Sequence, residues 1–113
     1  RFIATNEANA IEEYKNMIID SNADDIIYTS LFTGIHGSYL KGSITRSGLD
    51  PEKLENGDKN TMDFSKKESR TKAWKDIWGA GQGVGTMKDI KSVATLVNEI
   101  EEDYSITKKR VCR

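Results

Sequence analysis

Apolar residues recur with helical spacing near the start of the chain. Ile11, Tyr14 and Ile18 lie three and four positions apart, and this spacing predicts a helix over about 7–20. Acidic and small polar residues precede the stripe, as is typical of the capped first turn of a helix. We therefore expect one face of this helix to be buried.

A second stripe lies near the other end of the chain and predicts a helix over about 90–107. Its apolar members follow one helical face: Val93, Leu96, Val97, Ile100 and Tyr104. Asp89 or Ser92 is suited to begin the helix. The basic residues 108–110 fall at its end, where cations complement the helix dipole, so we interpret them as a solvated terminus.

Between the helices, β-branched and aromatic residues predict an extended segment over about 25–33. Residues 55–72 are almost wholly polar and predict a surface excursion, and residues 79–85 (GAGQGVG) form a glycine loop. A single buried strand needs a sheet to pair with, because its backbone donors and acceptors must be satisfied. We expect that sheet to lie outside these residues, which favours a fragment of a larger enzyme.

Composition narrows the classes of function. Seventeen basic and 18 acidic residues give a net charge of −1, so no basic surface favours nucleic acid. No stretch approaches the ~20 apolar residues of a membrane span. The chain has one cysteine, Cys112, and one histidine, His36, which disfavours a disulfide or a cysteine-based metal site. We expect a cytoplasmic protein of one segment, residues 1–113, with no metal site.

The glycine loop is the most unusual local feature. Its spacing does not match the dinucleotide fingerprint, because Val84 stands where the third glycine would be needed, and no Gly-Lys-Ser/Thr follows as in a phosphate-binding loop. Direct contact with a ligand and a tight structural connection both remain open. Trp74 and Trp78 are four apart and fit either core packing or the shielding of a cofactor. His36 has no partner placed by a motif, so we assign no catalytic residue.

Four segments carry a resemblance to a known family: residues 1–8 (RFIATNEA), 31–40 (LFTGIHGSYL), 48–51 (GLDP) and 73–85 (AWKDIWGAGQGVG). Together they resemble the FMN-dependent nitronate monooxygenases, formerly called 2-nitropropane dioxygenases. The related FMN-dependent enoyl-acyl carrier protein reductases share the barrel and the Gly-Gln element. The segments occur in order through nearly the whole chain.

The resemblance implies an α/β fold, the C-terminal fragment of a TIM (β/α)8 barrel, itself mostly helical with one or two short strands and long irregular connections. It implies that FMN lies at the carboxyl face of the strands, as is usual for barrel active sites. By analogy, Gly81, Gln82 and Gly83 are its expected contacts here. The family's catalytic histidine and phosphate-binding glycines precede this segment, so the chain alone is expected to be inactive.

The implied partners are the remainder of the chain's own barrel and a small-molecule substrate. The implied reaction is the oxidation of alkyl nitronates with FMN and molecular oxygen. Two alternatives stay open: an enoyl-acyl carrier protein reductase or another flavin reductase, and a non-catalytic interaction module that uses its helical stripes.

Overall fold

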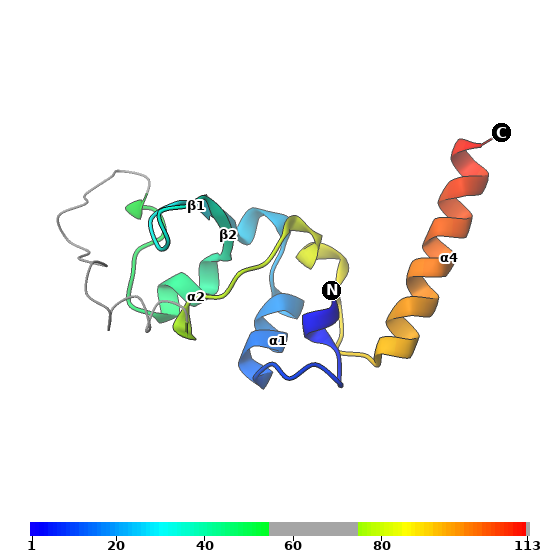
Figure 1. Ribbon diagram of the computed structural model, residues 1–113, viewed down its shortest axis with the longest axis horizontal. Coiled ribbons are helices and arrows are strands. Elements are labelled where there is room, and N and C mark those ends of the chain that lie inside the picture. Colours follow the sequence, from blue (N-terminus) through cyan, green and yellow to red (C-terminus); the bar gives the residue numbers. More distant parts are fainter. Residues whose placement is uncertain (55–74, 113) are drawn as a thin grey trace.

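The computed structural model describes residues 1–54 and 75–112. The polar excursion predicted over 55–72 lies outside the described residues. The described chain is mostly helical with two short strands (Figure 1). In chain order its elements are η1 (Phe2–Ala4), α1 (Glu12–Asp20), η2 (Ala23–Asp25), β1 (Ile26–Thr29), β2 (Gly37–Leu40), α2 (Lys41–Arg46), η4 (Gln82–Thr86) and α4 (Val93–Val111).

The strand predicted near 25–33 forms part of a hairpin. Strands β1 and β2 pair antiparallel, with Ile26 opposite Leu40 and Thr29 opposite Gly37. The turn between them contains Gly34 at φ 80°, a conformation that glycine adopts without a steric cost. β1 therefore ends at Thr29, and the residues up to 33 belong to the turn rather than to the strand.

The free edge of β2 is also paired. The Leu40 N–H donates to the Trp78 carbonyl at 2.8 Å, and the Ala80 N–H donates to the Ser38 carbonyl at 3.2 Å. The expectation that the sheet lies outside these residues is therefore wrong. Strand β1 pairs with β2, and β2 pairs in turn with residues 78–80. The error arises because the three glycines near β2 predict irregular backbone.

Helix α1 begins five residues later than predicted, at Glu12 rather than near 7. The backbone before it is engaged elsewhere: the Asn6 N–H donates to the Lys91 carbonyl at 3.0 Å, and Thr5 forms a parallel bridge with Lys91. Glu7 does not serve its own helix either, since its carboxylate accepts from the Val93 N–H at 3.0 and 3.2 Å. Long-range pairing overrides the local helical pattern here.

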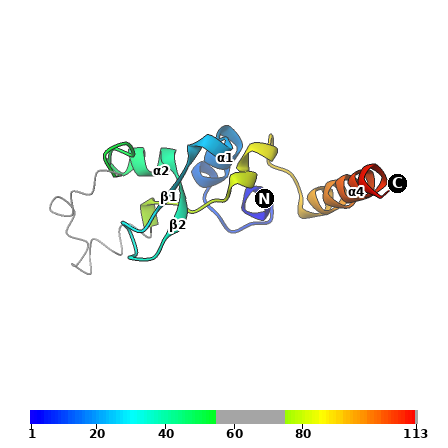
Figure 2. The same cartoon turned by 90° about the horizontal axis from the view of Figure 1, so that it is seen from above.

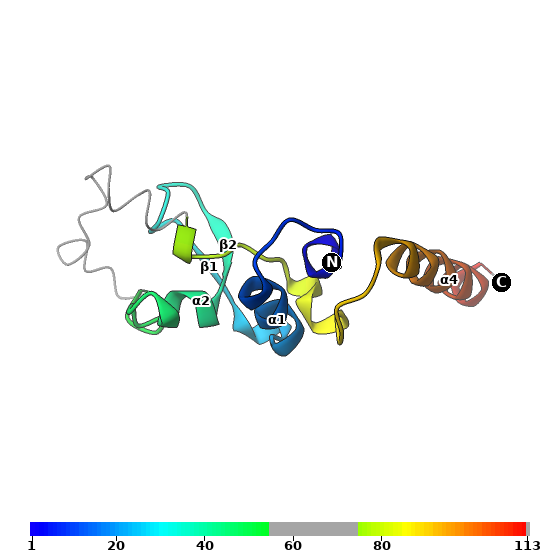
Figure 3. The ribbon, with the colours of Figure 1, turned by 90° about the horizontal axis from the view of Figure 1, so that it is seen from below.

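Helix α4 spans Val93–Val111 and is capped by Ser92, whose Oγ accepts from the Thr95 N–H at 3.1 Å. It begins about three residues after the predicted start and continues about four residues past the predicted end. All three views place it at one end of the molecule, beyond the N-terminal segment (Figures 1, 2 and 3). Leu96 is its one buried residue among those described.

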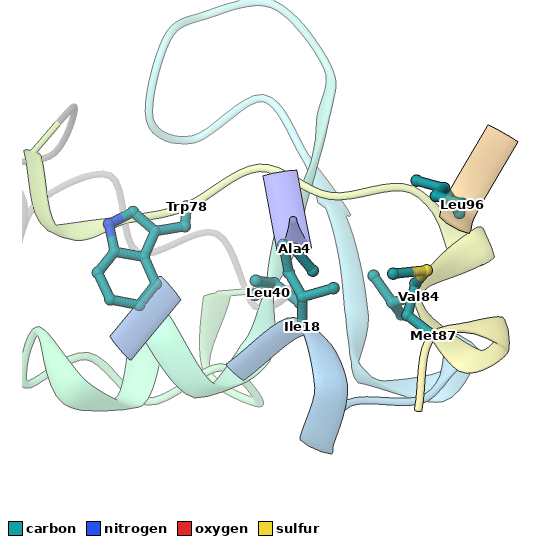
Figure 4. Packing of buried hydrophobic residues seen from close by; sticks show 7 residues of the cluster. All are labelled: Ala4, Ile18, Leu40, Trp78, Val84, Met87 and Leu96. Carbon is teal, nitrogen blue, oxygen red and sulfur yellow. The ribbon is translucent and has the colours of Figure 1, made fainter. Parts of the chain in front are cut away.

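The core forms a row that runs from the hairpin to the start of α4 (Figure 4). Its buried members are Ala4, Ile18, Leu40, Trp78, Val84, Met87 and Leu96. A smaller cluster joins Phe32, from the turn between β1 and β2, with Ile44 and Ile77. The core therefore collects residues from both sides of the glycine loop, and this fixes where the loop begins and ends.

No helix in the described ranges is both long and apolar enough to cross a membrane.

Candidate cofactor-contacting loop

The segment that leads into the glycine loop is held from three elements. The buried Ser43 hydroxyl, on α2, accepts from the Trp78 N–H at 2.9 Å and donates to the Leu40 carbonyl at 2.8 Å. The two backbone bonds to β2 hold the same segment. From α1, the Tyr14 hydroxyl donates to the Gly79 carbonyl. The start of the loop is thus fixed by both backbone and side chains.

Trp78 contacts both an aromatic ring and a cation. Its indole stacks on Tyr14 with ring centroids 4.8 Å apart, and the Arg46 guanidinium lies 3.9 Å from the indole centroid. The indole N–H donates to the Lys75 carbonyl at 3.1 Å. Burial raises the pKa of the Tyr14 hydroxyl, so it stays a neutral donor to Gly79. The prediction of core packing is confirmed for Trp78, whereas Trp74 lies outside the described residues.

The far side of the loop is anchored by apolar packing. Val84 and Met87 are buried in the main core, and the Met87 N–H donates to the Val84 carbonyl at 3.0 Å. Gly85 lies beside η2, since a Cβ added there would make an ordinary contact with the Ala23 nitrogen, 3.7 Å away. The short helix η4 is therefore pinned against η2.

The middle of the loop differs from its two anchored ends. Gly81, Gln82 and Gly83 are exposed, and a Cβ added at either glycine would meet no atom within 4 Å. Neither glycine has a positive φ, so their backbone does not demand glycine. The Gln82 amide makes no hydrogen bond to any residue that the structure describes. Packing within the described chain gives no reason for these glycines, and the space beside them can admit a ligand.

The other residues of chemical interest do not gather at this loop. His36 is exposed in the hairpin turn and lies against Tyr28, with ring centroids 5.0 Å apart. Cys112 is an exposed thiol at the end of α4. Across residues 1–54 and 75–112, no three metal-ligating side chains come together.

Sequence reasoning misses two residues that hold the loop. Periodicity places Tyr14 in the stripe of the first helix, but its hydroxyl reaches a carbonyl 65 positions away. Ser43 gives no signal, because a serine between Gly42 and Ile44 is ordinary in a polar segment. Only tertiary contacts reveal either role.

No family model matches this sequence, and no curated protein matches it. Two solved structures of FabK from Thermotoga maritima share its fold. One superposes with a TM-score of 0.67 at 18% identity, and it covers 98% of this chain and 37% of the FabK chain. A point mutant of FabK gives a TM-score of 0.65 at 20% identity, and it covers 98% of this chain and 34% of that chain.

The chain thus spans about a third of the length of the structures that it matches. The expected fold class is confirmed: a small, mostly helical segment with two short strands that matches a partial region of the FabK TIM barrel.

Proposed function

We propose that this chain is part of a flavin-dependent oxidoreductase of the FabK kind, an FMN-dependent enoyl-acyl carrier protein reductase. The observation that carries the proposal is the shared fold over 98% of the chain. FabK lies within the nitronate monooxygenase superfamily, to which four segments of this sequence bear a resemblance. The reductase reading, an alternative at the sequence level, therefore becomes the leading one.

The glycine loop fits the requirements of a flavin contact. The open sides of Gly81 and Gly83 leave room for a planar ring or a phosphate chain to approach the backbone. Gln82 offers an exposed amide that can both donate and accept hydrogen bonds. When bound, FMN supplies the acceptance and transfer of electrons, and the protein supplies position and surroundings.

The role of this chain in that reaction is positioning. Tyr14 and Ser43 hold the entry of the loop, and Val84 holds its exit, so the exposed amide of Gln82 sits on a braced backbone. A preorganised contact costs less on binding than one on a mobile loop, because its ordering is paid in folding. No residue of the described chain is proposed as an acid or base.

Oxidation of alkyl nitronates with molecular oxygen is the second candidate. Residues 31–40, 48–51 and 73–85 resemble one branch of the nitronate monooxygenase family, and the Gly-Gln element within 73–85 is shared with the reductases. The two candidate reactions share FMN. They differ in the compound that reduces the flavin and in the compound that reoxidises it. A non-catalytic interaction module is the third, and it requires no flavin.

The first test is the visible spectrum and intact mass of the purified protein. A flavin band at about 450 nm identifies a flavoprotein, and a species heavier than 12.7 kDa identifies accompanying polypeptide. Nicotinamide oxidation that depends on a 2-enoyl thioester supports the reductase. Oxygen uptake that depends on a nitronate supports the monooxygenase. A colourless protein of 12.7 kDa that does not take up added FMN overturns both enzymatic proposals in favour of the interaction module.

The loop itself is tested by Gly81→Val. Its φ of −94° and ψ of 171° suit a β-branched residue, and its added side chain meets open space. We therefore expect unchanged thermal stability together with a loss of flavin content or flavin affinity. Full flavin content in Gly81→Val would place the cofactor away from this loop.

A further inference from the structure

We draw no further inference here: the strongest candidate, the surface patch of Tyr28, Ile35 and His36 on the β1–β2 hairpin, is exposed in the part of the chain that the structure describes, and nothing in the structure shows what covers it.

Discussion

Replacing Ser43 by alanine tests how the entry of the glycine loop is held. The hydroxyl is fully buried and serves as both acceptor and donor, from the Trp78 N–H at 2.9 Å and to the Leu40 carbonyl at 2.8 Å. Alanine fits the same space without either bond. The change therefore leaves a buried backbone N–H with no acceptor, and it barely alters packing.

The magnitude follows from those two bonds. An orphaned buried donor costs about 1–3 kcal/mol, and the lost bond to the carbonyl adds roughly 0.5–1 kcal/mol. We expect Ser43→Ala to lower the free energy of unfolding by about 2–3 kcal/mol. Ser47→Ala is the matched control, because the Ser47 hydroxyl donates to the Ile44 carbonyl and accepts from no residue that the structure describes. The control should cost about 0.5–1 kcal/mol.

Urea denaturation followed by far-ultraviolet circular dichroism measures both variants. With a slope of about 1–3 kcal/mol per molar, the Ser43→Ala midpoint should fall by roughly 1 M or more. Hydrogen exchange adds a local measure, since the Trp78 amide should lose protection in this variant alone. Equal costs for Ser43→Ala and Ser47→Ala would refute the claim that this hydroxyl braces the loop.

Three further perturbations test other parts of the molecule. Leu96→Ala should lower the free energy of unfolding by about 2–4 kcal/mol, because Leu96 is buried, whereas Val97→Ala should lower it by under about 0.5 kcal/mol, because Val97 is exposed. Equal costs in chemical denaturation would contradict the described core. Glu7→Gln should lower the free energy of unfolding by about 0.5–1 kcal/mol, because it removes the negative charge at the start of α4, and the loss should be smaller at high salt. A loss that does not depend on salt would contradict this assignment. Burial raises the pKa of Tyr14, so the folded protein favours the neutral hydroxyl. The stability that this hydroxyl contributes is complete below its ordinary pKa of about 10 and is lost as pH rises through the raised value. The stability of Tyr14→Phe should therefore fall less at alkaline pH, and an identical alkaline decline would contradict the assignment.

The sequence pattern predicts the two long helices because each carries an apolar stripe of helical period. It places the start of α1 wrongly, since Glu7 and the backbone of Asn6 are taken by segment 91–93, more than 80 positions away. It also predicts irregular backbone where β2 forms, because Gly37 and Gly42 weigh against regular structure in local terms. Pairing with β1 and with residues 78–80 outweighs that preference. A local sequence pattern does not identify such distant partners.

The glycine loop shows a different limit. Its unusual composition draws attention to Gly81 and Gly83. Composition alone does not distinguish a glycine required by its backbone conformation from one required by the close approach of another group. A Cβ at Gly85 would make an ordinary contact with the Ala23 nitrogen, 3.7 Å away, and a Cβ at Gly81 or Gly83 would meet no described atom within 4 Å. Contact of those two glycines with FMN stays a prediction, and the open space beside them is what makes it testable by substitution.

The apolar face of α4 extends the same reasoning from a loop to a surface. Periodicity predicts that Val97, Ile100 and Tyr104 face an apolar neighbour, and in the described chain they are exposed. An amphipathic helix is stabilised when another apolar surface covers its apolar face. An isolated helix in water gains little stability from such a face. The expected partner of this face, the remainder of the chain's own barrel, stays a prediction.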